Sequence, residues 1–180
     1  MFALPGRRSS AGAAPAGSGG DTQPYASGST NSANRSCMVD LILPRLRAGN
    51  KKALLDELAR VAAPLAQLDR AIVLSALQER ERIGCTGIGQ GVALPHARFP
   101  TIGKPVTVFA RLAAPIEYEA VDGRRVDLVY LLLGPETASD EHLKTLACAA
   151  RLFRDPTARQ ELRHAPDEAG LRAILSGKHP

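Results

Sequence analysis

The chain alternates helical and extended hydrophobic patterns from residue 38 onward. Apolar residues recur at three- and four-residue spacing after Asn50, a residue type that favours the position before a helix. We predict a helix through about Ala62, which Pro64 is expected to interrupt because proline has no N–H to donate. Its predicted inward face consists of Leu54, Leu55, Leu58 and Val61.

A second helix is predicted after Asp69, which is another preferred capping residue. Its inward positions are expected to be Ile72, Val73 and Leu77, which follow helical spacing. Gly84 closes this pattern, and glycine is suited to the left-handed turn that ends many helices. We therefore expect the chain to turn at Gly84 and to leave the helix there.

Three apolar runs predict strands over residues 92–94, 106–112 and 126–133. The third run ends in LVYLLL, without a polar interruption. A strand with one solvated face alternates apolar and polar residues, whereas a strand covered on both faces does not. Residues 126–133 are therefore predicted to form a central strand that is covered on both faces.

Three further helices are predicted in the last part of the chain. Ser139 is expected to cap a helix over about residues 140–153. Asp155 followed by Pro156 is typical of a helix start, because proline is well tolerated at the first helical position. A short helix is expected after Asp167. This mixture of elements indicates a single α/β domain with helices on both faces of its sheet.

The composition is ordinary for a globular protein, with 180 residues, 44% of them apolar and 23% charged. No apolar run approaches the roughly 20 residues of a membrane span, so no membrane insertion is expected. The net charge is +5, but three arginines and one aspartate in residues 1–37 leave only +3 for the remainder. This scattered excess, together with 4% aromatic residues, argues against a nucleic-acid partner.

The first 36 residues are dominated by Gly, Ser, Ala and Pro, a composition that cannot bury enough apolar area to fold. We predict a disordered tail over residues 1–37, a folded domain over 38–176 and a short tail over 177–180. The arginine pair near the N-terminus is not followed by the apolar segment of an export signal, so export is not expected. The N-terminal tail is expected to contribute nothing to folding.

The three cysteines, Cys37, Cys85 and Cys148, form an odd count without metal-ligand or redox spacing. They fit reduced thiols in a cytoplasm. A zinc site that combines Cys85 and Cys148 with His96 and His142 is the alternative, but no CxxC or HxxxH pair supports it. We therefore expect no metal and no cofactor.

The most informative segment is RERIGCTGIGQGVALPHAR, residues 80–98. Its glycines are not followed by Lys-Ser/Thr and do not open a helix, which argues against a nucleotide site. The proline before His96 fixes the backbone next to the imidazole. A neutral imidazole is a nucleophile near pH 7, and arginines on both sides favour a phosphoryl group as the group transferred.

This segment closely resembles the pattern Arg-Glu-x-x-x-Ser-Thr-Gly-Ile-Gly-x-Gly-x-Ala-x-Pro-His of enzyme IIA proteins of the bacterial phosphotransferase system, in their fructose, mannitol and nitrogen-regulatory branch. The resemblance extends from about Met38 to Leu175 and includes DLVYLLL at 127–133 and DEHLKTL at 140–146. No second transporter domain follows, which favours the stand-alone nitrogen-regulatory type. The resemblance implies a mixed five-stranded sheet.

The resemblance also implies roles for individual residues. His96 is the phosphorylated nucleophile, and Arg80 contacts the phosphoryl group. The Thr86 hydroxyl points toward the reactive imidazole, and His142 holds this imidazole or its phosphoryl group by hydrogen bonding. Arg98 is a second candidate for the phosphoryl oxygens, from the chemistry of arginine alone. Without the resemblance, Thr86 would be a turn residue, Arg98 a surface arginine and His142 an ordinary first-turn histidine.

The expected function is that of a cytoplasmic phosphoryl carrier with a phosphohistidine intermediate, rather than a turnover enzyme. A histidine-containing phosphocarrier protein would donate to His96, and the phosphorylation state would control binding to regulatory targets such as kinases or transporters. Two alternatives stay open: transfer onward to a sugar permease, and a binding module whose phosphoryl group never moves on.

The similarity of residues 38–44 to the start of family members also favours translation from Met38.

Cys85 stands where the family usually carries serine. A thiol is a weaker hydrogen-bond donor than a hydroxyl, so we expect only the backbone of Cys85 to matter. A thiol enzyme that uses Cys85 with His96 is a third alternative. His164 and His179 match no family position and are expected on the solvated surface.

Overall fold

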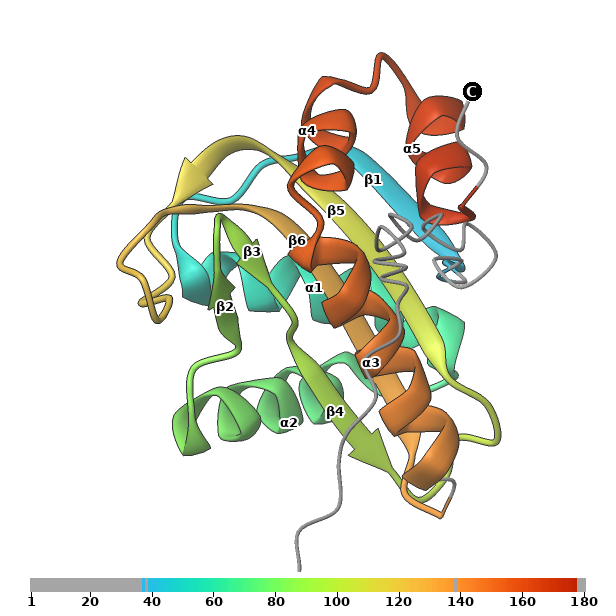
Figure 1. The fold of residues 1–180 in the computed structure, drawn as a ribbon. Helices are drawn as coiled ribbons and strands as arrows, with labels where there is room; N and C mark the ends of the chain where they lie inside the picture. The colour runs from blue at the N-terminus through green and yellow to red at the C-terminus, as the bar shows by residue number, and fades with distance from the viewer. Residues whose placement is uncertain (1–36, 38, 138, 178–180) are drawn as a thin grey trace, which may run out of the picture. The chain divides into compact units, whose positions relative to one another are not determined.

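An open mixed sheet lies between two layers of helices (Figure 1). The computed structural model describes residues 37, 39–137 and 139–177, without the side chain of Ser139. Within these residues there are six strands and five helices. In chain order they are β1 (Leu41–Leu46), α1 (Lys51–Ala66), α2 (Arg70–Ile83), β2 (Gly87–Gly89), β3 (Val92–Ala93), β4 (His96–Phe99), β5 (Val106–Ile116), β6 (Val126–Pro135), α3 (Ser139–Arg154), α4 (Pro156–His164) and α5 (Glu168–Leu175).

The strand order is β1-β5-β6-β3-β2, and β4 also pairs with β6. β1 runs parallel to β5, β5 antiparallel to β6, and β2 antiparallel to β3. β3 and β4 both run parallel to β6, with Ala93 opposite Val129 and His96 opposite Leu132. These two short strands therefore occupy one row beside β6, and the sheet is mixed as expected.

The family resemblance implies five strands, and the described part of the chain contains six. The difference arises because the row beside β6 is divided into β3 and β4 at Leu94 and Pro95. Proline has no N–H to donate to a ladder. Its carbonyl still accepts a hydrogen bond from Leu132 N at 3.0 Å, so the row continues along β6. The sheet is thus five rows wide, and His96 begins the strand that follows the break.

β6 is the central strand that the sequence predicts, with every residue from Leu128 to Leu133 fully buried. Its side chains alternate between two hydrophobic clusters, one on each face of the sheet. Val129, Leu131 and Leu133 belong to the cluster under α1 and α2. The alternate residues belong to the cluster under α3, α4 and α5. Helices therefore cover both faces, which confirms the predicted architecture.

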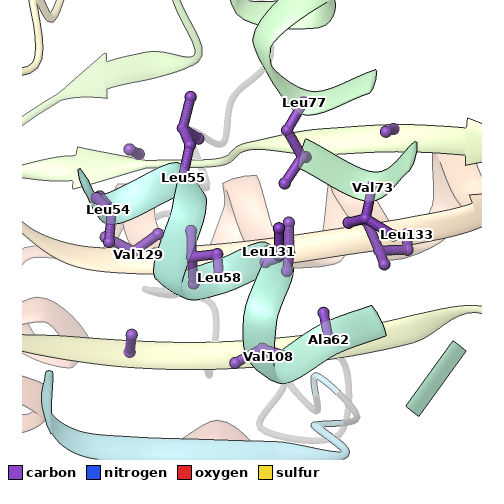
Figure 2. Close-up of a cluster of buried hydrophobic side chains, with 14 of the residues drawn as sticks. Leu54, Leu55, Leu58, Ala62, Val73, Leu77, Val108, Val129, Leu131 and Leu133 are labelled. Atoms are coloured by element: carbon purple, nitrogen blue, oxygen red, sulfur yellow. The ribbon is translucent and has the colours of Figure 1, made fainter. Parts of the chain in front are cut away.

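The cluster between α1, α2 and the sheet consists mainly of aliphatic side chains, some of which Figure 2 shows. Leu54 and Leu58 of α1 and Leu77 of α2 are almost completely buried. They pack over Val108 of β5 and Leu131 of β6. Burial of each such side chain stabilises the fold by about 1.5–3 kcal/mol. This packing fixes α2 against β4, the arrangement on which the site depends.

Three predicted helix starts, at Asn50, Asp69 and Asp155, are confirmed as capped, and Asp167, after which a short helix was expected, is also a cap. Asn50 and Asp69 precede α1 and α2, and Asp155 and Asp167 precede α4 and α5. In each case a side-chain oxygen accepts a hydrogen bond from a backbone N–H at 2.7–2.9 Å. Helix α3 begins at Ser139, whose side chain lies outside the described part, so its capping role stays a prediction.

The first two helices differ from the predictions in two details. Helix α1 continues past Pro64 to Ala66, and Ala66 is buried against the core, which keeps the last turn in place. Ile72 was expected to face inward, but its side chain is 55% exposed, whereas Val73 and Leu77 are buried. Adjacent helical residues point about 100° apart, so when Val73 points into the core, Ile72 lies at the edge of the buried face.

The left-handed turn predicted at Gly84 is wrong. Gly84 has a φ of 178°, which is extended backbone, so the chain leaves α2 without a left-handed residue at this position. Left-handed residues occur later, at Gly89, Gln90 and Gly91 in the β2–β3 hairpin. A Cβ at Gly91 would also lie only 2.7 Å from an Asp127 carboxylate oxygen. The tight turn of this segment therefore lies in the hairpin.

Cys37 lies in the core, although the sequence predicts it in the tail. It is 5% exposed, its N–H donates to Leu175 O at 2.7 Å, and its Sγ lies 2.9 Å from Cys148 Sγ. The predicted disorder of residues 1–36 and the end of the tail at 178–180 lie outside the described residues, so the domain boundaries stay predictions. No helix in the described ranges is long and apolar enough to cross a membrane.

Candidate active site

His96 is held by the backbone that precedes it. It is the first residue of β4, it follows Pro95, and its imidazole is half-buried. Nδ1 lies 2.8 Å from the carbonyl oxygen of Leu94. Because a carbonyl only accepts hydrogen bonds, Nδ1 carries the proton, and Nε2 keeps its lone pair. The geometry thus places the free lone pair of His96 on Nε2.

Arg80 donates to Nε2 of His96. Its Nε lies 3.0 Å from Nε2 of His96, and its Nη1 donates to Gly84 O at 2.9 Å. A guanidinium has no acceptor, so this contact also requires an unprotonated Nε2. Arg80 reaches His96 because the last turn of α2 packs against β4. The structure therefore brings together two residues that are sixteen positions apart in the sequence.

His142 comes to the same place from the opposite face of the sheet, on the first turn of α3. The centroids of the His96 and His142 rings are 5.9 Å apart, and the planes are tilted by 59°. The His142 side chain is buried, and its Nδ1 has no hydrogen-bond partner among the described residues. Burial, followed by the charge of Arg98 and the ring of His96, lowers the pKa of His142 to about 4.

Gly134 of β6 makes room for His142. A Cβ at Gly134 would overlap Nδ1 of His142 and would lie 2.9 Å from two carbons of the ring. Gly134 pairs with Arg98 across the β4–β6 ladder, so the imidazole packs directly on the sheet. Sequence analysis did not identify Gly134 as a site residue. The available signal was a glycine at the end of a continuous apolar strand, which marks a close approach of another group.

Arg98 lies two residues after His96 in β4. Side chains alternate along a strand, so Arg98 is exposed on the face of β4 that carries His96, while Ala97 between them is buried. Burial lowers the pKa of His96, and the charges of Arg80 and Arg98 lower it further, against the opposing effects of Leu94 and Glu81. His96 is therefore neutral at pH 7.

The four side chains of Arg80, His96, Arg98 and His142 line one cleft of about 670 Å³. Exposed apolar residues also line it, including Leu143, which is 55% exposed. Glu79 and Glu136 line the cleft as well, so it combines two cations, two carboxylates, two neutral imidazoles and several apolar residues. The two arginines beside the imidazole suit an anionic group, and the apolar residues suit a partner with an apolar surface that delivers it.

The Thr86 hydroxyl does not pair with His96, contrary to the prediction. Thr86 is buried, and its Oγ1 lies 2.5 Å from Glu81 Oε2 and 2.9 Å from the Tyr118 hydroxyl. The buried carboxylate of Glu81 is the stronger acceptor and draws the hydroxyl away from the imidazole. Sequence analysis missed Glu81 and Tyr118, although Glu81 is next to Arg80 in the motif.

The remaining candidates lie away from the nucleophilic nitrogen. Cys85 Sγ lies 3.4 Å from Tyr118 O, and burial raises the pKa of the Cys85 thiol. His164 is exposed and contacts Gln160 O, and His179 lies outside the described residues. Across the described ranges, no group of three or more His, Cys, Asp or Glu side chains is placed to hold a metal ion.

Comparison with known proteins identifies the family of this chain. Residues 36–178 match the family described as "Phosphoenolpyruvate-dependent sugar phosphotransferase system, EIIA 2". The chain is 44% identical over 137 residues to a nitrogen regulatory protein of Bradyrhizobium diazoefficiens, covering 76% of this chain and 90% of the relative. It is 37% identical over 134 residues to a nitrogen regulatory protein of Pseudomonas aeruginosa, covering 74% and 87%.

Solved structures show the same fold. The nitrogen regulatory protein IIA-Ntr of Neisseria meningitidis superposes with a TM-score of 0.72 at 36% identity, covering 75% of this chain and 92% of that one. The IIA mannitol protein of Escherichia coli superposes with a TM-score of 0.64 at 17% identity, covering 74% and 94%, which shows the fold alone. The chain therefore belongs to the EIIA type 2 family of the phosphotransferase system, and within it to the nitrogen regulatory proteins.

Proposed function

We propose that this chain is a cytoplasmic phosphoryl carrier that accepts a phosphoryl group on Nε2 of His96 from a histidine-containing phosphocarrier protein. Its phosphorylation state then controls binding to regulatory targets. The observation that carries the proposal is the pair of contacts on the imidazole. Leu94 holds the proton on Nδ1, and Arg80 directs a cation at the lone pair of Nε2.

The transfer requires little chemistry from the protein beyond position and charge. The lone pair of Nε2 attacks phosphorus, and the bond between phosphorus and the donor nitrogen breaks. The donor imidazole takes back the electron pair of that bond, and the His96 proton stays on Nδ1, beside Leu94 O. Arg80 moves from Nε2 onto the phosphoryl oxygens, and Arg98 supplies a second positive charge at the mouth of the cleft.

His142 has a different role in this proposal. Its low pKa keeps the ring neutral at pH 7, so it adds no charge beside the nucleophile. A neutral imidazole donates one hydrogen bond and supports the phosphoryl group without making His96 less basic. His142 is therefore expected to affect the rate and the lifetime of the phosphohistidine more than the identity of the acceptor.

Radioactive phosphoenolpyruvate tests the proposal in the presence of enzyme I and the phosphocarrier protein. Wild-type protein should take up a label that is lost in mild acid and survives alkali, as phosphate on an imidazole nitrogen does. His96→Ala should take up none. The matched control is His164→Ala, because His164 is exposed and contacts only Gln160 O in the described structure, and it should label normally. Acid-labile labelling of His96→Ala would show that another residue is the acceptor.

Capture experiments separate the regulatory role from its alternatives. Phosphorylated and unphosphorylated protein should bind different sets of regulatory proteins if the phosphorylation state is the signal. Transfer of the label to a membrane sugar permease would favour the transport alternative instead. Label that is never released, together with phosphorylation-dependent binding, would identify a binding module.

A further inference from the structure

Glu81 is a nearly buried carboxylate between α1, α2 and the loop before β2. Its side chain is 7% exposed, and Lys51 Nζ lies 3.2 Å from Oε1. Thr86 donates both its backbone N–H, at 3.2 Å, and its hydroxyl, at 2.5 Å. The Tyr118 hydroxyl lies 3.3 Å from Oε2. Every neighbour of this carboxylate is therefore a donor or a cation.

The carboxyl group of Glu81 is ionised. Burial alone would raise its pKa, but the hydrogen bonds from Thr86 and its other neighbours outweigh burial and bring the pKa below its usual value. A buried charge is costly unless it is paired and hydrogen-bonded. Lys51 supplies the pairing, and it also reaches Glu119 at the surface. The hydrogen bonds from Thr86 and Tyr118 and the ion pair with Lys51 thus stabilise the ionised form of Glu81.

A continuous chain of hydrogen bonds leads from Glu81 to the nucleophile. Glu81 fixes Thr86, whose carbonyl accepts the N–H of Leu94 at 2.9 Å. The carbonyl of Leu94 in turn accepts Nδ1–H of His96 at 2.8 Å. Pro95, between Leu94 and His96, leaves this peptide little freedom. A displacement of Thr86 therefore moves the carbonyl that decides which imidazole nitrogen carries the proton.

We propose that Glu81 is a positioning residue for the phosphoryl transfer: through Thr86 and Leu94 it keeps the proton of His96 on Nδ1 and leaves Nε2 as the nucleophile. The effect of Glu81 on the rate of phosphorylation rests on the proposed function. Its effect on the position of the His96 proton does not, because no phosphocarrier is needed to observe it.

The electrostatic surroundings of His96 sharpen the inference. Arg80 from α2 and Arg98 from β4 lower its pKa, whereas Glu81 raises it, and His142 from α3 is neutral. Glu81 is a carboxylate that raises the pKa of His96, and the carboxylates of Glu79 and Glu136 line the same cleft as the imidazole. Loss of the Glu81 charge should therefore lower the pKa of His96, in addition to letting its proton move between Nδ1 and Nε2.

The test compares Glu81→Gln with Glu57→Gln. Glu57 lies on α1, pairs with Arg60 at the surface at 2.8 Å and does not line the cleft, so it is the control for loss of one paired carboxylate. Nitrogen-15 NMR of the imidazoles reports the tautomer and the pKa of His96 without any partner protein. We expect wild type and Glu57→Gln to hold the proton on Nδ1, and Glu81→Gln to distribute it over both nitrogens with a lower pKa.

Labelling by the phosphocarrier should then slow about 10- to 100-fold in Glu81→Gln, the size expected when a reacting group is misplaced. The acidic limb of the rate against pH should move to lower pH, because the pKa of His96 is lower. A wild-type tautomer in Glu81→Gln, or an unchanged labelling rate, overturns the inference. A changed tautomer in a protein whose wild type takes up no label supports the positioning by Glu81 and overturns the proposed function instead.

A second pair of variants keeps the test decisive if Glu81→Gln does not fold. Thr86→Val has the same shape as threonine and keeps the backbone N–H bond to Glu81 but loses the hydroxyl bond, whereas Thr86→Ser keeps both. Thr86→Val should loosen the tautomer of His96 in the same direction, and Thr86→Ser should resemble wild type. A wild-type tautomer in Thr86→Val contradicts the proposed chain from Glu81 to the imidazole.

Discussion

Nε of Arg80 lies 3.0 Å from Nε2 of His96, so the guanidinium occupies the direction from which phosphorus must approach. The same side chain is anchored at its Nη1 by Gly84 O. In the proposed transfer, Arg80 covers the acceptor nitrogen before phosphorylation and is already within reach of the phosphoryl oxygens. Under that proposal one residue both contacts the lone pair and supplies positive charge to the transferred group.

Replacement of Arg80 should slow the transfer without abolishing it. Arg80→Ala removes the charge but leaves the acceptor nitrogen, so labelling should fall about 10³-fold, as for other arginines that act on transferring phosphoryl groups. Arg80→Lys should recover part of the rate, because lysine keeps the charge but cannot bind two oxygens in one plane. Single-turnover labelling measures both rates. A rate for Arg80→Ala within a few-fold of wild type would remove Arg80 from the mechanism.

Gly134→Ala should destabilise the protein through His142. The added methyl group would overlap Nδ1 of His142, so either the imidazole or the strand must move. We expect a loss of about 1–3 kcal/mol, typical of overpacking, together with slower phosphorylation. In the double variant with His142→Ala the methyl group enters the vacated space, so the second substitution should restore part of the stability. Gly103→Ala is the control, because nothing lies within 4 Å of its Cβ. Additive losses in urea unfolding would contradict the overlap.

His142 should make stability depend on pH. In the unfolded chain histidine takes up a proton near pH 6.5, whereas the pKa of His142 in the folded protein is about 4. Between these values the unfolded state binds more protons, so stability falls as the pH is lowered from about 6.5 to about 4. The contribution of this residue should reach about 3 kcal/mol. Urea unfolding of His142→Leu should show a shallower acid loss than wild type. Equal slopes for the two proteins would contradict a buried neutral His142.

Cys85→Ser should be tolerated. The thiol accepts from Gly87 N and contacts Tyr118 O, and a hydroxyl can make both contacts. Burial also raises the pKa of Cys85, which disfavours the thiolate that a thiol enzyme requires. We expect phosphorylation within a few-fold of wild type in the same labelling assay. Complete loss of labelling would instead support the thiol-enzyme alternative.

Removal of Cys37 should cost stability, although the sequence predicts no contribution from the tail. A chain that begins at Met38 loses the hydrogen bond to Leu175 O and the burial of the Cys37 side chain. Together these contribute about 1–2 kcal/mol, or a few degrees in the thermal midpoint. A chain that begins at Ser36 retains both contacts and is the control. Equal midpoints for the two chains would show that Cys37 adds nothing to the fold.

Local chemistry was sufficient to predict most of the elements. The capping residues Asn50, Asp69, Asp155 and Asp167 start their helices because a short polar side chain satisfies a free N–H within the same few residues. The uninterrupted apolar run of β6 could only be buried on both faces. Local patterns do not predict an element that depends on a distant part of the chain. The short strands β2 and β4 contain glycine or polar residues and are strands because they pair with β3 and β6.

The sequence by itself determined the α/β class, the central strand and the residue types of the site, because hydrophobic periodicity, capping and a long ordered motif are local properties. Only the tertiary structure decided that Nδ1 of His96 faces Leu94 O and leaves the lone pair on Nε2, that Thr86 turns toward Glu81, and that Gly134 makes room for His142. Each of these depends on which groups meet across the sheet. A hydroxyl or an imidazole pairs with whichever partner packing brings within 3 Å, and the spacing of residues along the chain does not contain that information.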